Sequence, residues 1–518
     1  MNWIDGLIFA IYVAGMIAVA IYTSKKSKSL NDFLFAGKNG VGGWISAFAY
    51  GTTYFSAVIF IGYAGKFGWS FGIASIWIGL GNAIIGSLLA WKVLAKRTKN
   101  MTYSLQARTM PEFFEKRYES HGLKAYASIL IFVFLVPYAS SVYNGLSNLF
   151  ETVFGIKGWI IIIILAAMTA LYLFFGGYFA TAITDFIQGI IMLIGVVVML
   201  ILFITRSEVN GIEGLTKLAN EGFGLFIKDA PHEHWLFGKN MSLIALVLLT
   251  SFGVWALPQT IHKYYAVRDQ KSINQGMVIS MLFALIIGFI AYFIGGLSRL
   301  FLSDLGQVGN ITDNIIPFMI KKVIPVGVTG LIAVLILSAS MSTLASVSLA
   351  SASVLAIDLY KGVLRKDAKE SRVTWVMRIW CIIFILISTI IAVLNIKFKL
   401  TAIAYLMGLS WGVLSGSFMG PYVLGIYNKK ITKTAVWVSM LLTLSLTFIL
   451  IIVFGYMIGN FEISFAKAIQ NGMSASPLIG VICMVVSVLS TVIISLFTKK
   501  PSDECINKAF SSVENGII

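Results

Sequence analysis

Apolar residues occur along this chain in long blocks, and polar residues gather between the blocks instead of alternating with apolar ones. A block of about 20 apolar residues forms a helix that can cross a hydrocarbon layer of roughly 30 Å. By this criterion the sequence predicts an all-α polytopic membrane protein with about thirteen transmembrane helices. Their expected centres are Val13, Phe55, Gly81, Phe134, Leu165, Ile194, Leu249, Ile286, Leu337, Ile385, Leu409, Leu444 and Val486.

Composition agrees with this pattern. The 518 residues are 58% hydrophobic and 12% charged, and the mean hydropathy is +0.89, well above the usage of a soluble domain. The longest polar gaps, residues 96–124 and 206–239, are too short for a separate soluble domain of typical size. The chain is therefore expected to form one membrane domain.

The distribution of lysine and arginine predicts the orientation in the membrane. With the amino terminus outside, most of the 39 basic residues fall inside, Lys263, Arg268 and Lys271 among them, as the positive-inside rule requires. We therefore expect a multi-pass protein of the plasma (inner) membrane with a cytoplasmic carboxy terminus. The net charge of +17 then serves topology, and no nucleic-acid partner is expected because no aromatic and basic binding module accompanies it.

Two of the expected helices carry residues that interrupt a helix. The second contains Gly51 to Ser56, rich in hydroxyl and β-branched side chains, and the seventh contains Pro258, which removes a backbone donor. The two occupy matching positions in two halves of five spans, a pattern typical of transporters built from inverted repeats. An ordinary proline kink with small residues for close packing is an equally good interpretation of these features alone.

The ninth expected helix, within residues 331–359, carries an unusual row of hydroxyls. Ser338, Ser342 and Ser346 are four residues apart and therefore share one helical face. Neutral oxygens of this kind suit a weakly bound monovalent cation, so the row indicates a cation site inside the membrane.

Asp185 is the one clear carboxylate inside an apolar span, and no arginine or lysine is expected deep in a span. A carboxylate in the membrane normally faces a partner, a water-filled path or a cation. The alternative is a cap at the cytoplasmic end of its helix. The sequence leaves both interpretations open.

Four separated motifs resemble the sodium:solute symporter family, whose members share a LeuT-like fold. They are Asn31 to Lys38, Met110 to Phe114, Gly176 to Asp185 and Met341 to Leu344. The resemblance implies a core of five plus five inverted repeats. It divides the chain into an N-terminal extra helix and loop (1–40), a transport core of helices 2–11 (41–427) and two C-terminal helices with a short tail (428–518).

The same resemblance implies where sodium binds. Its ligands would be the backbone carbonyls of Thr52, Phe55 and Ala339 and the hydroxyls of Ser342 and Thr343. Some relatives bind a second sodium through an aspartate and further hydroxyls. Asp185, Ser342 and Ser346 match that pattern, but Ala345 between them has no side-chain oxygen, so Asp185 is alternatively expected to line the inward exit path of the ion.

The solute is expected between the two interrupted helices. Candidate contacts are Ser56, Tyr138, Trp255, Gln259 and Trp411. Gln259 stands where family members that carry proline have histidine, which weighs against proline itself. The absence of a deep basic residue favours a small solute with at most one charge.

The sequence thus predicts a sodium-coupled symporter that imports a small organic solute by alternating access, with Na⁺ as the coupled ion. A proline-like amino acid or a monocarboxylate is favoured, with sodium-coupled sugar or vitamin uptake, or a transporter-like solute sensor, as alternatives. No covalent chemistry is implied, so an enzyme is not expected. His232 and His234 flank Glu233, but two histidines without further ligands do not predict a metal site.

Overall fold

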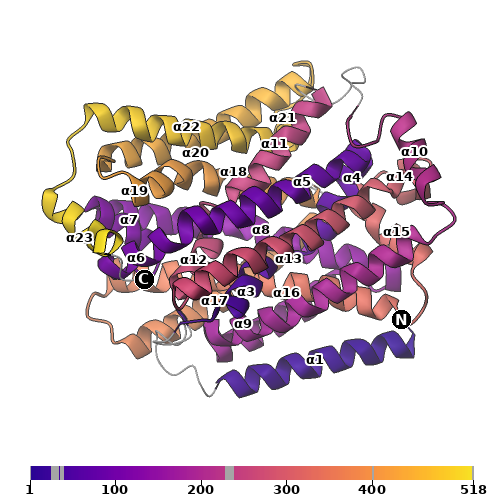
Figure 1. Ribbon diagram of the computed structural model, residues 1–518, viewed down its shortest axis with the longest axis horizontal. Coiled ribbons are helices and arrows are strands. Elements are labelled where there is room, and N and C mark those ends of the chain that lie inside the picture. Colours follow the sequence, from indigo (N-terminus) through magenta and orange to yellow (C-terminus); the bar gives the residue numbers. More distant parts are fainter. Residues whose placement is uncertain (1, 25–33, 36–39, 228–237, 399–401, 516–518) are drawn as a thin grey trace.

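The chain is described by a computed structural model over residues 2–24, 34–35, 40–227, 238–398 and 402–515. These residues form helices and no β-strand. Figure 1 shows the long helices running side by side along the molecule, with α1 (Trp3–Ser24) on one flank and α22 (Ser476–Phe497) on the opposite flank. The all-α architecture expected from the apolar blocks is confirmed.

Helical segments follow one another along the chain, and segments labelled η are 3₁₀ or π helices. The first half contains α3 (Gly43–Tyr54), η1 (Val58–Tyr63), α4 (Ala64–Phe71), η2 (Gly72–Ser75), α5 (Ile76–Gly81), η3 (Asn82–Leu89), η4 (Trp91–Ala95), α6 (Lys96–Leu105), α7 (Met110–Tyr118), α8 (His121–Phe154), α9 (Gly158–Ile204) and α10 (Ile212–Asn220). The second half contains α11 (Gly238–Gly253), α12 (Pro258–Ala266), α13 (Gln270–Gly296), α14 (Ser298–Phe301), η5 (Leu305–Val308), η6 (Thr312–Asn314), α15 (Ile315–Val323), α16 (Thr329–Ser353), η7 (Val354–Leu364), α17 (Glu370–Phe398), α18 (Ile403–Phe418), η8 (Met419–Leu424), α19 (Gly425–Tyr427), α20 (Lys433–Ile458), α21 (Phe465–Ser474) and α23 (Asp503–Asn515).

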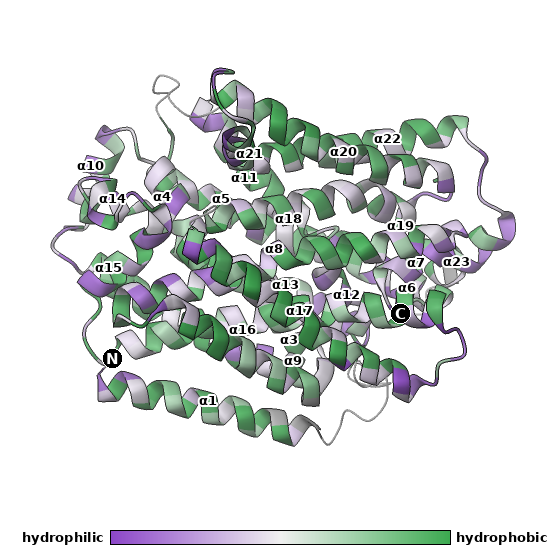
Figure 2. Ribbon diagram, turned by 180° about the vertical axis from the view of Figure 1, so that it is seen from behind, coloured by the Kyte–Doolittle hydropathy of each residue, from purple (hydrophilic) through white to green (hydrophobic). Residues whose placement is uncertain are grey.

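Within the described residues, ten helices are long and apolar enough to cross a membrane, and two shorter apolar helices cover Trp3–Val19 and Gly158–Phe174. The expected count of thirteen is not confirmed by this number, in which the 48 residues of Val58–Leu105 count once. Figure 2 shows apolar residues along the middle of the long helices and hydrophilic residues gathered toward the two ends of the molecule. Exposed apolar side chains such as Ile194, Leu386 and Ile493 suit contact with lipid.

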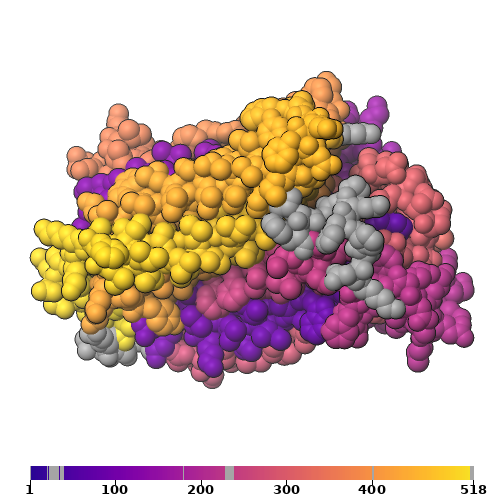
Figure 3. Space-filling view, turned by 90° about the horizontal axis from the view of Figure 1, so that it is seen from above, coloured from indigo at the N-terminus to yellow at the C-terminus, as the bar shows by residue number. Residues whose placement is uncertain are grey.

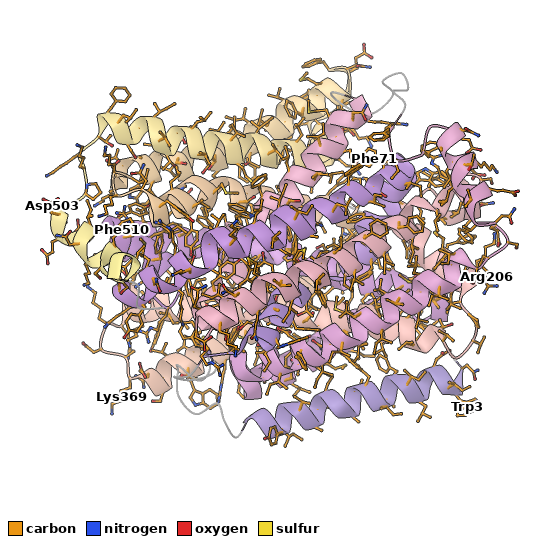
Figure 4. The ribbon with its side chains drawn as sticks, in the orientation of Figure 1. Trp3, Phe71, Arg206, Lys369, Asp503 and Phe510 are labelled. Atoms are coloured by element: carbon orange, nitrogen blue, oxygen red, sulfur yellow. The ribbon has the colours of Figure 1, made fainter. Side chains whose placement is uncertain are left out.

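Residues that the sequence assigns to opposite sides of the membrane lie at opposite ends of the molecule. In Figure 4, Trp3 and Arg206 lie toward one end, whereas Lys369, Asp503 and Phe510 lie toward the other. Figure 3 shows the C-terminal helices, in orange and yellow, covering one face. These labelled residues therefore lie at the ends that the expected topology gives them.

Both expected helix interruptions are present. Helix α3 stops at Tyr54, and Phe55 is extended (φ −102°, ψ 99°) before η1 begins. Helix α11 ends at Gly253, and α12 begins at Pro258, where the missing N–H of proline costs nothing because the first turn of a helix has no partner for it.

A third break divides α9 into two spans. Gly177 has φ 58° and ψ −158° inside this helix, a conformation that residues with a Cβ rarely adopt. Glycine at this position therefore lets the chain turn from the span that ends before it into the span that carries Asp185.

Helix α16 occupies the centre of the bundle. It packs against α1, α3, α8, α9 and α17, and almost every side chain along it is buried. Its hydroxyls, among them Ser338, Ser342 and Ser346, therefore face other helices and not lipid. A cation site on this helix requires hydroxyls that are shielded from lipid, and this placement provides them.

Glycines bring α13 close to two neighbouring helices. A Cβ added to Gly68 of α4 would lie 2.1 Å from the carbonyl carbon of Gly295, and one added to Gly79 of α5 would lie 2.5 Å from that of Gly288. Small residues that let backbones approach in this way stabilise helix pairs in membranes. The first of the two contacts leaves no room for a methyl group.

Gly68→Ala is expected to destabilise the fold by about 1–3 kcal/mol, the usual range for overpacking, since backbone must move to admit the methyl group. Thermal unfolding of purified protein in detergent measures the effect. Gly15→Ala is the matched control, because a Cβ at Gly15 meets nothing within 4 Å. Equal melting temperatures for the two variants would contradict the close approach of α4 and α13.

Candidate functional site

The end of α3 meets the middle of α16 at a cluster of buried oxygens. Ser342 Oγ lies 3.2 Å from the carbonyl oxygen of Thr52 and 3.2 Å from that of Ala339, and its single hydrogen can be donated to either. Thr343 Oγ1 donates to the same Thr52 carbonyl at 3.2 Å. Four of the five residues expected to bind sodium therefore lie together, and all four are buried. A hydroxyl that rotates its hydrogen away would present a lone pair to a cation in this space.

The fifth expected residue, Phe55, lies at the interruption of α3. Its N–H closes the last turn by donating to Gly51 at 2.9 Å, and its extended backbone takes its own carbonyl out of the helical pattern. The next residue, Ser56, accepts a hydrogen bond from the N–H of Val58 at 3.2 Å and so stabilises the start of the following helical segment.

A second buried polar cluster surrounds Lys263 of α12. Its Nζ lies 3.4 Å from Asp185 Oδ2 and 3.0 Å from Ser346 Oγ. Ser346 Oγ in turn lies 2.8 Å from Thr53 Oγ1, and the ring of Tyr178 is 5.1 Å from the ammonium. The cluster joins α3, α9, α12 and α16. It lies one turn further along α16 than the oxygens around Ser342.

This cluster corrects the expectation for Lys263. The sequence placed it among the cytoplasmic basic residues and predicted no lysine deep in a span, but its side chain is 2% exposed and Asp185 is 0% exposed. The sequence feature that could have predicted its burial is its spacing from Gln259. Residues four apart lie on the same face of a helix, so Lys263 shares the face of a residue expected to contact the solute. The expectation of a weakly charged solute is based on the absence of a basic residue deep in a span, and Lys263 removes that argument, although Asp185 lies beside it as a counter-charge.

Aromatic side chains lie beside the interruption of α3. The ring of Trp411 on α18 is 5.8 Å from that of Tyr138 on α8 and 6.0 Å from that of Tyr54. The Tyr138 hydroxyl lies beside the hydroxyls of Ser56 and Thr343, yet it forms no hydrogen bond of good geometry within the described part of the chain. Three of the five expected solute contacts, Ser56, Tyr138 and Trp411, thus lie at or beside the interruption of α3.

The other two expected solute contacts lie on or before α12 and have different surroundings. Trp255 is half-buried, and its indole N–H donates to the carbonyl of Ile85 at 3.0 Å, while its ring packs on Phe252. Gln259 is buried, and its Oε1 has no hydrogen-bond partner among the residues that the structure describes. Gln259 therefore retains an acceptor for a solute, whereas the N–H of Trp255 is already engaged.

A cavity of about 530 Å³ opens along the second half of α8, in the part of the helix that comes after Tyr138. Polar side chains line much of it, including Asn144, Asn148 and Glu151. Asp313 also lines it and accepts a hydrogen bond from the N–H of Ile403 at 3.0 Å. Burial raises the pKa of Asp313, against the opposing effects of that N–H and of the nearby charge of Lys66.

The Met110 to Phe114 motif begins a short helix at a buried network of charges. Thr109 caps α7 by accepting from the N–H of Glu112 at 3.1 Å, and its hydroxyl donates to Asp358 at 2.8 Å. Lys124 lies 2.8 Å from Glu115 and 3.9 Å from Asp358. Residues that flank this motif, Thr109 and Glu115, therefore connect α7 to α8 and η7 through Lys124 and Asp358.

Parts of two sequence features lie outside the described residues. Most of the Asn31 to Lys38 motif is among them, and so are His232, Glu233 and His234. Within the described residues, no group of three or more His, Cys, Asp or Glu side chains is placed to hold a metal ion.

The fold resembles that of a solved transporter. A Na⁺-coupled sialic acid symporter in a substrate-bound outward-open state superposes with a TM-score of 0.77, at 19% sequence identity, over 97% of this chain and 99% of the other. That likeness assigns the LeuT-like fold to the chain.

Two curated relatives cover most of the chain. The osmoregulated proline transporter OpuE of Bacillus subtilis (strain 168) is 27% identical over 437 residues, which is 83% of this chain and 85% of that protein. A sodium/pantothenate symporter of Haemophilus influenzae (strain ATCC 51907 / DSM 11121 / KW20 / Rd) is 28% identical over 463 residues, 87% of this chain and 91% of that protein. Both relatives are transporters.

A family model matches residues 33–443 of the 518. The matched stretch contains both interrupted helices, the Asp185 and Lys263 pair and the hydroxyl face of α16. The apolar helices make the protein a multi-pass integral membrane protein, and its relatives and fold make it a transporter that couples solute import to sodium. The chain belongs to the sodium:solute symporter family.

Proposed function

We propose that sodium binds between the interruption of α3 and the hydroxyl face of α16, and that this binding drives solute import by alternating access. The ligands are the carbonyls of Thr52, Phe55 and Ala339 with the hydroxyls of Ser342 and Thr343. The observation that carries the proposal is the convergence of both hydroxyls on the Thr52 carbonyl, each at 3.2 Å. Neutral oxygens without a carboxylate suit a cation that must leave again on the other side.

The proposed solute is a proline-like amino acid or a monocarboxylate, held near Tyr138, Trp411, Ser56 and Gln259. Two relatives support this class, because one carries proline and the other carries pantothenate, which has a single carboxylate. The Oε1 of Gln259 and the hydroxyl of Tyr138 have no hydrogen-bond partner within the described residues and supply polar contacts for such a solute. Vitamin uptake is the second candidate, favoured by the pantothenate relative.

The proposed order of binding follows from linkage. Sodium draws the end of α3 onto α16 and orders the interruption beside Ser56 and Tyr138, which raises the affinity for solute. Solute must then raise the affinity for sodium by the same factor. Each charge that crosses about 100 mV contributes roughly 2.3 kcal/mol, which is near fiftyfold in accumulation.

The proposed topology has thirteen spans, the amino terminus outside and the carboxy terminus in the cytoplasm. Residues 1–40 form the additional N-terminal segment, residues 41–427 the core of five plus five inverted repeats, and residues 428–518 the C-terminal helices and tail. Two interrupted helices, one in each half of the core, support the repeat. The cavity along α8 then opens to the outside.

Uptake into liposomes tests the proposed function. Purified protein is reconstituted, and labelled amino acids, monocarboxylates and sugars are offered with and without an inward sodium gradient. One amino acid or monocarboxylate is expected to accumulate about tenfold or more above its outside concentration when the gradient is present, within the limit that the membrane potential sets. Accumulation of no solute, or equal uptake without sodium, would contradict the proposal.

A further inference from the structure

Lys263 places a positive charge where the sequence suggested a second ion. Its Nζ contacts Asp185 and Ser346 at 3.4 Å and 3.0 Å, and the resemblance matches both of them, together with Ser342, to a second sodium site. The ammonium therefore occupies two of the three candidate ligands of that ion. Asp185 and Lys263 are 78 positions apart in the sequence, so the pairing is a product of the fold.

The surroundings of the ammonium are those of a cation site. A carboxylate, a hydroxyl linked to a second hydroxyl and the face of an aromatic ring surround it, and they come from the three helices α9, α16 and α3. The second carboxylate oxygen, Asp185 Oδ1, is buried and has no hydrogen-bond partner in the described part of the chain. Oxygen ligands are thus present for a monovalent ion, and the lysine side chain fills the position between them.

The spacing along α16 separates this position from the proposed sodium site. Ser346 lies four residues after Ser342, which is about 6 Å along the helix. A second sodium beside Asp185 would also lie against the Lys263 ammonium, and like charges at such a distance repel strongly in a buried site. A mobile ion and the lysine therefore exclude each other.

We propose that the Lys263 ammonium acts as a resident cation that occupies the second cation position, so that this protein takes up one sodium ion and not two with each solute. This inference rests on the proposed function, because it presupposes that sodium binds at Ser342 and Thr343. It adds that the ion stoichiometry is set by a side chain of α12. Asp185 is then a counter-charge for Lys263 and not a ligand of a transported ion.

Counting bound sodium tests the inference without any transport measurement. Radioactive ²²Na⁺ binding to purified protein in detergent is measured to saturation and expressed per chain. Wild-type protein is expected to bind one ion. Lys263→Gln removes the resident charge and leaves Asp185, Ser346 and Thr53 open, so this variant is expected to bind two.

Matched variants test whether the charge of Lys263 sets the number of bound sodium ions. Lys263→Arg keeps a cation and should bind one ion, and Lys263→Gln with Asp185→Asn removes both charges and should return the count to one. Lys66→Gln is the control for a buried lysine elsewhere, since Lys66 lies over the Tyr405 ring at 3.4 Å and should leave the count at one.

Two results would overturn the inference. One is a count of two for the wild-type protein, and the other is a count of one for a folded Lys263→Gln variant. If Lys263→Gln does not fold, the number of ions bound by the wild-type protein still tests the inference. That number should be one, and the bound ion should be lost in the double variant Ser342→Ala, Thr343→Ala. A wild-type count of zero instead contradicts the proposed function, so the two failures are distinguishable.

Discussion

Replacing Ser342 and Thr343 together with alanine is expected to raise the sodium concentration for half-maximal uptake by about a hundredfold or more. Both hydroxyls reach the Thr52 carbonyl at 3.2 Å, and polar contacts to a charged group contribute about 1.5–3 kcal/mol each. Loss of two such contacts, at about 1.4 kcal/mol per tenfold change, gives the stated factor. Alanine leaves the packing of the helix largely intact.

The measurement is initial uptake of the identified solute at increasing sodium concentration in liposomes. Ser340→Ala is the control, because Ser340 bonds the carbonyl of Ile336 on its own helix at 2.7 Å and not α3. Its sodium dependence should match that of the wild-type protein. An unchanged sodium dependence in the double variant would remove Ser342 and Thr343 from the proposed site.

Asp185→Asn is expected to cost about 3–5 kcal/mol of stability, because it leaves the buried Lys263 ammonium without its counter-charge. Neither side chain of the pair is more than 2% exposed, so water does not compensate for the loss. The yield of monodisperse protein and its melting temperature measure the effect. The double variant Asp185→Asn, Lys263→Gln should recover most of the loss, since no charge is then left unpaired.

An exposed ion pair provides the comparison. Glu208 lies 3.5 Å from Lys322, and their side chains are 32% and 42% exposed, so Glu208→Gln should change stability by less than about 1 kcal/mol. If Asp185→Asn is as stable as the wild-type protein and keeps its sodium dependence, Asp185 is a polar helix end, as in the alternative interpretation of the sequence.

The sequence by itself determined the features that depend on neighbouring residues. Long apolar blocks must form helices in a membrane because no water satisfies their backbone groups, and Pro258 favours an interruption because it has no N–H. The common face of Ser338, Ser342 and Ser346 follows from helix geometry. These expectations hold in the structure, and the family resemblance then placed the facing carbonyls of Thr52 and Ala339 at the same point.

Only the tertiary structure decided the features that depend on residues far apart in the chain. The sequence around Lys263 is typical of a cytoplasmic basic cluster. Its burial follows from contacts with Asp185 and Ser346, which are 78 and 83 positions away in the chain. Trp255 turns its N–H to Ile85, 170 positions away. The local sequence pattern determines which segments are helical. The direction and the partner of each buried polar group depend on how the helices pack. A buried charge or hydrogen-bonding group must be satisfied by the side chain or carbonyl that the fold brings beside it.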